Sequence, residues 1–201
     1  MTLRWQARGP HTIVQIVATP EGVAAVDGAG MGLFREGSSD RHAEVALPGA
    51  ARRVARLGAA WLALEGGARH LTRIDKAGAA KVAEGKKPID AFATGEGGFA
   101  IARGPSVELW SDGGEERWSV DHEPCVKVAV LGGAVLAVSA EGELAFFDAA
   151  DGEQTGTLRL ASVELAETWH LVPLDAGRAV LALGDRLVWV DARTGDRKSV
   201  V

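Results

Sequence analysis

The chain contains 201 residues, of which 47% are hydrophobic and 24% are charged, and these fractions are typical of an ordinary globular domain. With 22 basic and 27 acidic residues the formal charge is -5, which removes the usual electrostatic basis for binding nucleic acid or an anionic membrane. A single cysteine, Cys125, excludes an internal disulfide, and the opening residues lack the apolar run of a secretory signal, so we expect a cytoplasmic protein.

One pattern recurs five times along the chain. It consists of an apolar stretch, a glycine turn, a second apolar stretch, another turn, a third stretch ending near Asp, and a turn closed by Gly. The stretches are about four to seven residues long, which is the length of a strand and too short for a helix. After an opening segment, 1–10, the copies occupy about 11–48, 49–86, 87–124, 125–162 and 163–201.

The spacing of the copies fits one type of repeat. The second stretches begin at Val23, Trp61, Phe99, Val135 and Val180, so the spacings are about 38, 38, 36 and 45 residues. A period near 40 is typical of four-stranded propeller blades. The clearest copy starts at Cys125 and is interrupted at 132–133, 141–142 and 148–152, whereas the first copy is the weakest.

The third stretch ends in an Asp-Ala-x-x-Gly turn in two copies, at 148–152 and 191–195, and in a shortened form at 75–78. In this feature the chain resembles the PQQ-like and WD40-like β-propeller repeats. The resemblance implies an all-β fold, a five-bladed β-propeller of four-stranded antiparallel blades. No copy has a Gly-His or Trp-Asp pair, so the resemblance indicates the fold and not a functional subfamily.

Two segments compete for the closure of the predicted ring. The segment Leu3–Ala7 resembles an outermost strand without a preceding blade, and we expect it to pair with the last blade as an N-terminal closing strand. The tail at 198–201 lies where the fourth strand of the last blade should be, so it is the alternative. Completion by another chain is a third possibility.

Motifs that carry chemistry are weak in this sequence. The glycines at 28–32 superficially resemble a dinucleotide loop, but Leu33 replaces the third Gly and a strand comes next, so a hairpin turn is favoured. The histidines occupy unequal positions in different repeats, and the Asp residues at 148 and 151 are typical turn caps. We therefore expect no metal, no cofactor and no catalytic residues. The five histidines are His11, His42, His70, His122 and His170.

The innermost strands of a propeller line its channel, so their polar residues are the candidate contacts for a ligand or partner. These are Gln15, Arg53, Asp90, Lys127, Glu167 and His170. A glycosidase would need two carboxylates converging there, and Asp90 and Glu167 are the one acidic pair. Basic neighbours would hold that pair ionised, which favours balanced charges in a channel over a general acid.

Six tryptophans divide into two groups by their positions in the repeats. Trp61, Trp110 and Trp189 fall in second or third strands, where packing between blades is expected. Trp5, Trp118 and Trp169 fall nearer the rim or the channel, and any of them left exposed would be a candidate anchor for a protein partner.

These observations favour a noncatalytic β-propeller that acts as a protein-protein interaction scaffold, adaptor or regulatory subunit. A lectin-like propeller that binds a small ligand or glycan is the alternative, although the divergence among the copies disfavours repeated pockets. A glycan-active enzyme is third. PQQ-dependent oxidation is weakest, because the chain is acidic and has no adjacent cysteines. High Ala, Arg and Gly usage suggests a GC-rich bacterial genome.

Overall fold

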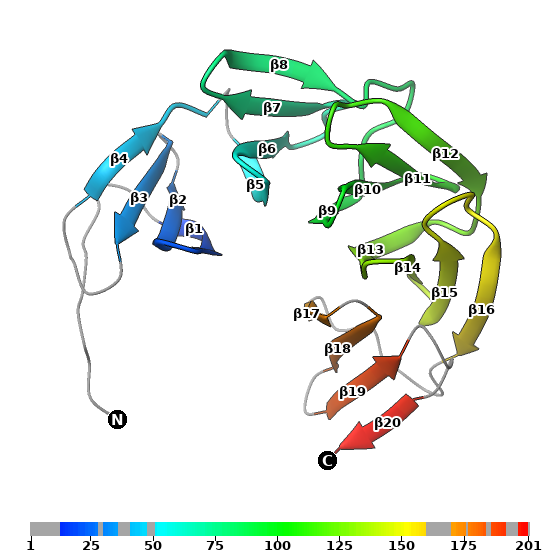
Figure 1. The fold of residues 1–201 in the computed structure, drawn as a ribbon. Helices are drawn as coiled ribbons and strands as arrows, with labels where there is room; N and C mark the ends of the chain where they lie inside the picture. The colour runs from blue at the N-terminus through cyan, green and yellow to red at the C-terminus, as the bar shows by residue number, and fades with distance from the viewer. Residues whose placement is uncertain are drawn as a thin grey trace. The chain divides into compact units, whose positions relative to one another are not determined.

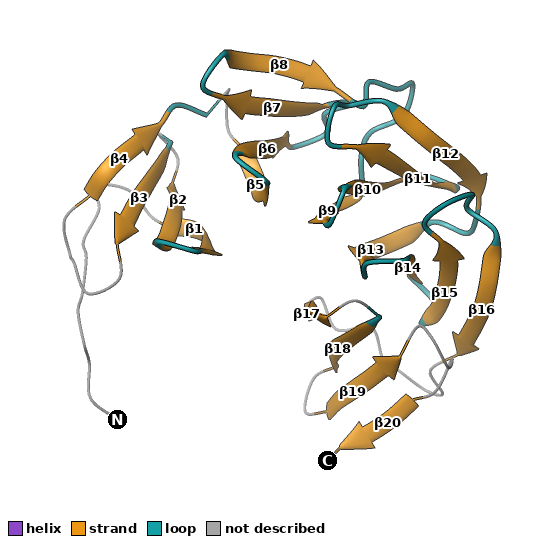
Figure 2. Cartoon of the chain, in the orientation of Figure 1, coloured by secondary structure: helices purple, strands orange, loops and turns teal. Residues whose placement is uncertain are grey.

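The computed structural model describes residues 13–27, 30–35, 41–47, 51–159, 170–175, 177–183, 186–191 and 197–200. These residues form five four-stranded sheets, and no helix occurs among them (Figures 1 and 2). Each sheet uses four consecutive strands, ordered in space as in the sequence, and every neighbouring pair is antiparallel. The expected fold class, all-β with five four-stranded antiparallel propeller blades, is confirmed.

The chain divides into two compact units, residues 1–84 and 85–201. The first unit holds blades 1 and 2. Blade 1 consists of β1 (Ile13–Thr19), β2 (Gly22–Asp27), β3 (Met31–Arg35) and β4 (Arg41–Val45). Blade 2 consists of β5 (Ala51–Leu57), β6 (Ala60–Glu65), β7 (Leu71–Asp75) and β8 (Gly78–Val82).

The second unit holds blades 3, 4 and 5, which succeed one another in chain order (Figure 1). Blade 3 consists of β9 (Ala91–Gly95), β10 (Gly98–Arg103), β11 (Ser106–Ser111) and β12 (Glu116–Asp121). Blade 4 consists of β13 (Cys125–Val130), β14 (Ala134–Ser139), β15 (Glu143–Asp148) and β16 (Gln154–Arg159). Blade 5 consists of β17 (His170–Asp175), β18 (Arg178–Leu183), β19 (Arg186–Asp191) and β20 (Arg197–Val200).

Turn residues end the strands where the sequence predicts. In blade 4 the breaks expected at 132–133, 141–142 and 148–152 fall between successive strands. Gly132, Gly142 and Gly152 have φ values of 65°, 83° and 79°, a conformation that residues with a Cβ rarely adopt. Asp148 Oδ1 accepts a hydrogen bond of 2.7 Å from Ala150 N, which confirms the expected turn-capping role.

The strand register corrects one detail of the repeat alignment. Val135 is the second residue of β14 and pairs with Val130 and Phe147. In blade 5 the residue in this register position is Ala179, which pairs with Pro173 and Val190, and not Val180. The sequence-based alignment is wrong by one residue there because Ala179 is a weak start for an apolar stretch.

Within each unit, the blades use alternate residues of their strands to pack on one another. We call the face toward the preceding blade the leading face and the face toward the next blade the trailing face. Within β14, Val135 and Ala137 pack on blade 3, whereas Leu136 and Val138 pack on blade 5. Blade 1 likewise packs Ala24 and Val26 on blade 2. The core of each unit therefore consists of apolar layers between its blades, as period-two alternation requires.

One of the two closure segments has a defined place. β20, in the predicted tail, pairs with β19 as the fourth strand of blade 5. The opening segment 1–10, predicted as the closing strand, lies outside the described residues.

Candidate functional site

Four of the six predicted channel residues occupy one register position. Gln15, Arg53, Lys127 and His170 each pair with the fifth residue of the second strand of their blade. In blades 1, 2 and 4 a β-bulge immediately precedes this position. In blade 3 the position belongs to Ala91, so the predicted Asp90 lies one residue before it.

Gln15 uses its side-chain amide to join two blades. Its Nε2 donates a hydrogen bond of 2.8 Å to Val54 O, and its Oε1 accepts one of 2.6 Å from Val54 N. The amide thus satisfies both backbone groups of Val54 on β5, as a neighbouring strand would. Because both functional ends of the amide are occupied, Gln15 acts as a link between blades 1 and 2.

The other residues at this position differ in chemistry and exposure. Arg53 is half-buried, and burial lowers the pKa of its guanidinium below the ordinary value, although an arginine remains charged at neutral pH. Lys127 is half-buried and His170 is exposed. The position therefore holds Gln, Arg, Ala, Lys and His in successive blades, which is not a repeated binding pocket.

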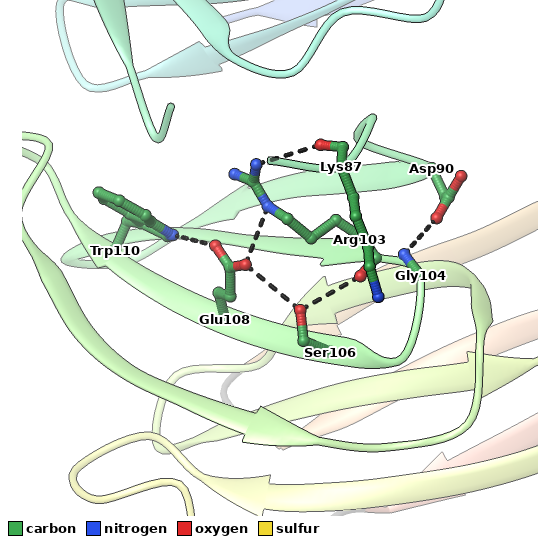
Figure 3. Close-up of polar contacts among 7 residues, drawn as sticks. All are labelled: Lys87, Asp90, Arg103, Gly104, Ser106, Glu108 and Trp110. Atoms are coloured by element: carbon green, nitrogen blue, oxygen red, sulfur yellow. Dashed lines mark hydrogen bonds and ion pairs between the residues drawn. The ribbon is translucent and has the colours of Figure 1, made fainter. Parts of the chain in front are cut away.

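The predicted acidic residue Asp90 stabilises a turn of its own blade. Its Oδ2 accepts a hydrogen bond of 2.7 Å from Gly104 N, in the turn between β10 and β11 (Figure 3). Its proposed partner in an acid pair, Glu167, lies outside the described residues. Asp90 is exposed but already committed to the backbone, so its described role is structural.

Blade 3 contains a buried polar network that the sequence analysis did not identify (Figure 3). Arg103 and Glu108 are 5% and 6% exposed, and Arg103 Nε lies 2.9 Å from Glu108 Oε1. Trp110 Nε1 donates a hydrogen bond of 2.9 Å to the other carboxylate oxygen. Ser106 Oγ lies 3.3 Å from Glu108 Oε1 and 3.2 Å from Arg103 O, so its single hydrogen is shared between them.

The same network attaches the segment that leads into blade 3. Arg103 Nη1 donates a hydrogen bond of 3.3 Å to Lys87 O. A side chain at Gly85 would collide with the guanidinium, so glycine permits the close approach of the backbone. Because Glu108 is buried and satisfied by Arg103 and Trp110, this carboxylate serves packing rather than proton transfer.

Cys125 and His122 lie close together at the start of blade 4. Cys125 Sγ donates a hydrogen bond of 3.1 Å to Glu123 O and lies 3.4 Å from His122 Nδ1. Burial, together with the negative charges of Glu123, Asp90 and Glu143, raises the pKa of Cys125 to about 12. An activated cysteine needs a lowered pKa, so this pair lacks the property of a nucleophilic dyad.

Trp118, a predicted partner anchor, is buried between blades 3 and 4. It is 8% exposed, its ring centroid lies 6.1 Å from that of Phe147, and its Nε1 donates a hydrogen bond of 3.2 Å to Ala149 O. A Cβ at Gly152 would collide with the indole, so the Asp-Ala-x-x-Gly turn of blade 4 closes directly over Trp118. This burial places Trp118 in the core, while Trp5 and Trp169 lie outside the described residues.

The tryptophans expected in the core have different environments. Trp61 is 7% exposed, and the Arg56 guanidinium lies 5.9 Å from its ring centroid. Trp110 stacks on Phe99 with ring centroids 6.3 Å apart. Trp189 is 40% exposed, so the expectation of core packing is wrong for this residue.

Trp189 belongs to an exposed apolar surface on one face of blade 5. Ala179, Leu181, Val188 and Val190 pack on blade 4, and the residues that alternate with them form the opposite face. That trailing face includes four large apolar side chains, each 40–50% exposed, which we call the apolar face of blade 5. They are Val172, Leu174, Leu187 and Trp189.

The described part of the chain offers no other evident site for chemistry. Among these residues no three His, Cys, Asp or Glu side chains are grouped so as to hold a metal ion. Within the same ranges, no helix has the length and apolar character needed to cross a membrane.

Comparison with known proteins identifies the fold. The sequence matches no protein-family pattern and no curated protein. Among solved structures, the crystal structure of Kluyvelomyces marxianus Hsv2 aligns with 96% of this chain and 71% of its own, with a TM-score of 0.72 and 10% identity. The Neurospora crassa Pan2 WD40 domain aligns with 94% of this chain and 65% of its own, with a TM-score of 0.69 and 11% identity.

BamB from Moraxella catarrhalis is also similar, with a TM-score of 0.61, 14% identity, and coverage of 74% of this chain and 47% of its own. The chain thus spans less than two thirds of the BamB and Pan2 structures. Identities this low indicate shared architecture rather than shared activity. Together with the five described sheets, these likenesses show that the chain has the fold of a WD40-like and PQQ-like β-propeller.

Proposed function

We propose that this chain is a noncatalytic β-propeller that docks a protein through the apolar face of blade 5. The observation that carries the proposal is the exposure of four large apolar side chains on one sheet face. Contiguous apolar patches are uncommon on monomeric proteins and typically mark protein interfaces. A tryptophan within such a patch is the residue type most often found at the energetic centre of an interface.

The remaining candidate residues support a binding role over an enzymatic one. Gln15 links two blades, Asp90 holds a turn, and Glu108 is neutralised by Arg103. The raised pKa of Cys125 keeps its thiol protonated near neutral pH. The chemical variation at the bulge position also disfavours a lectin-like set of equivalent pockets, because such pockets would repeat the same side chains.

A matched pair of variants tests the proposal. Trp189 and Val126 are both 40% exposed, but Val126 belongs to β13 of blade 4 and is not part of the apolar face of blade 5. We expect Trp189→Glu to weaken the binding of a protein partner by at least about tenfold, whereas Val126→Glu leaves it unchanged. Binding would be measured by site-specific photocrosslinking from both positions, followed by titration of the crosslinked protein. Equal loss in the two variants, or no protein crosslinked from position 189, contradicts the proposal.

A further inference from the structure

The outermost strand of blade 2, β8, forms a regular edge of its sheet (Figure 1). Its register with β7 is continuous, joining residues 71–75 to residues 78–82, so the hairpin loop consists of residues 76–77 alone. This loop is the shortened form of the Asp-Ala-x-x-Gly turn, and Asp75 Oδ1 stabilises it by accepting a hydrogen bond of 2.8 Å from Ala77 N. Because a two-residue loop adds no extra residue to either strand, the hairpin has no bulge.

Three of the other outer strands have an irregularity that β8 lacks. Register shifts occur between the third and fourth strands of blades 1, 3 and 4, and they affect the pairing of β4, β12 and β16. Such bulges distort an outer edge and hinder the addition of a further strand. The β19–β20 pair is also continuous, but β20 has four residues against five in β8. Among the described strands, β8 is therefore the longest outer strand with a regular edge.

The backbone of β8 has hydrogen-bonding groups that its own sheet does not use. The pair that closes a two-residue loop exchanges both of its hydrogen bonds, and bonded and non-bonded pairs then alternate along the hairpin. Ala79 and Lys81 therefore fall at non-bonded pairs and direct their N–H and C=O groups away from β7. Both residues are exposed, as are Gly78 and Ala80. Apart from the lysine, no side chain here is larger than a methyl group, so an extended segment has access to this backbone.

Blade 2 is also the basic part of an acidic chain. Residues 51–84 contain seven Lys and Arg against three Asp and Glu, a net charge of +4, whereas the whole chain carries -5. One of these acids, Asp75, already pairs with Arg73, with 3.3 Å between Oδ2 and Nε. Lys76 and Lys81 are exposed and form no ion pair with another described residue. Their positive charge is thus available to an anionic partner at the edge of β8.

We propose that β8 pairs with an extended acidic segment of a partner protein, which adds a fifth strand to blade 2. Main-chain hydrogen bonds to Ala79 and Lys81 hold the segment, as in other cases of strand addition. A carboxylate opposite or diagonal to Lys81 stabilises the pairing. A basic strand is disfavoured because it repels the same ammonium group, so this lysine selects the charge of the partner. The inference concerns a surface separate from the apolar face of blade 5 and does not rest on it.

A pair of synthetic peptides tests the selection by charge. The probe is a capped, fluorescent peptide, Thr-Glu-Val-Glu-Val-Glu-Thr, and its counterpart has Lys in place of each Glu. Fluorescence anisotropy with the purified full-length chain should show saturable binding of the acidic peptide alone. Lys81→Glu should weaken that binding by at least about tenfold and should create binding of the basic peptide, because the cross-strand charge is reversed. Arg159→Glu makes the same charge change in β16, whose pairing contains a bulge, and should alter neither affinity.

Pairing through the backbone needs a separate test. Ala79→Pro removes an N–H that points away from β7, so the hairpin should still form, but the acidic peptide should no longer bind. In the unaltered chain, saturating acidic peptide should slow hydrogen exchange at the amides of Ala79 and Lys81. The amides of Ala80 and Val82 should change less, because they already face β7.

Three outcomes would overturn the inference: no saturable binding of the acidic peptide, equal weakening by Lys81→Glu and Arg159→Glu, or binding that leaves exchange at the Ala79 and Lys81 amides unchanged. Circular dichroism of each variant shows whether it is folded, and the exchange measurement needs no variant at all. Trp189→Glu should leave the peptide affinity unchanged, so failure of the strand addition and failure of the docking surface on blade 5 are distinguishable.

Discussion

Blades 4 and 5 show how one sheet face can have two different roles. Phe146 and Trp189 occupy the same register position on their third strands, yet Phe146 is 1% exposed and Trp189 is 40% exposed. Both sequences supply apolar residues there, so hydrophobicity does not set the exposure. The neighbouring blade sets it, because blade 5 covers Phe146, whereas the described residues provide no comparable burial for Trp189. A face that stabilises the fold in one blade is thus an exposed apolar surface in another, and this is the surface that we propose docks a protein.

The largest expected effect comes from truncating these two residues separately. Phe146→Ala should lower the free energy of unfolding by about 3–5 kcal/mol, because it removes a fully buried ring and leaves a cavity. Trp189→Ala should change it by less than about 1 kcal/mol in dilute solution, since the residue is 40% exposed and its removal leaves no closed cavity. Urea unfolding followed by circular dichroism measures both. A similar loss of unfolding free energy in the two variants would show that Trp189 is buried in solution, and the two positions would then not differ in role.

A second prediction concerns a position where blade 3 departs from blade 4. Glu108 lies in the register position of Ala145 and forms the buried ion pair with Arg103. Glu108→Ala should cost about 3–5 kcal/mol, because it strands a buried cation. The double variant Arg103→Met/Glu108→Leu should recover most of that loss, as an apolar layer resembling blade 4. If the double variant is as unstable as the single one, the network supplies more than charge neutralisation.

The sequence predicts the blades well because their signals are local. Gly132, Gly142 and Gly152 interrupt apolar stretches at the places where the chain must turn, and strand length results from their spacing. Register is harder to predict, and the pattern favours Val180 over Ala179 because both residues are apolar neighbours on opposite faces. The alignment is also shifted by one residue at Asp90, because Ala91 occupies the register position that the other predicted channel residues share.

The candidate site is less predictable because exposure and pairing depend on the neighbouring blade. Trp118 and Trp189 both lie in the middle of six-residue strands, and only packing makes one of them a buried residue and leaves the other 40% exposed. The buried Arg103–Glu108 ion pair could not be predicted from the sequence for a related reason. Two opposite charges five residues apart predict a surface pair unless the hairpin between them is known to be buried.

A third prediction compares two residues at the bulge position. Gln15→Ala should lower the free energy of unfolding by about 1–3 kcal/mol, because Val54 N and O lose their partners. His170→Ala, at the same register position in blade 5, should change it by less than about 0.5 kcal/mol because His170 is exposed. Hydrogen exchange at the Val54 amide gives a local reading. Unchanged protection there in Gln15→Ala would show that the link contributes little.

The smallest expected effect is a pH dependence carried by Cys125. Its pKa rises from 9.0 to about 12 in the folded chain, so the unfolded chain releases the thiol proton first as the pH increases. The stabilising contribution is therefore fully present below pH 9 and is lost as the pH rises toward 12. Between about pH 8 and pH 9.5 the unaltered chain should lose less than about 1 kcal/mol more than Cys125→Ala, because the thiol of the unfolded chain is only partly ionised over most of this range. Urea unfolding of both chains at the two pH values measures the difference. Rapid reaction of the Cys125 thiol with iodoacetamide in the folded chain at pH 8 would contradict the raised pKa. It would also show that the thiol is accessible to solvent, although Cys125 belongs to the buried layer between blades 3 and 4.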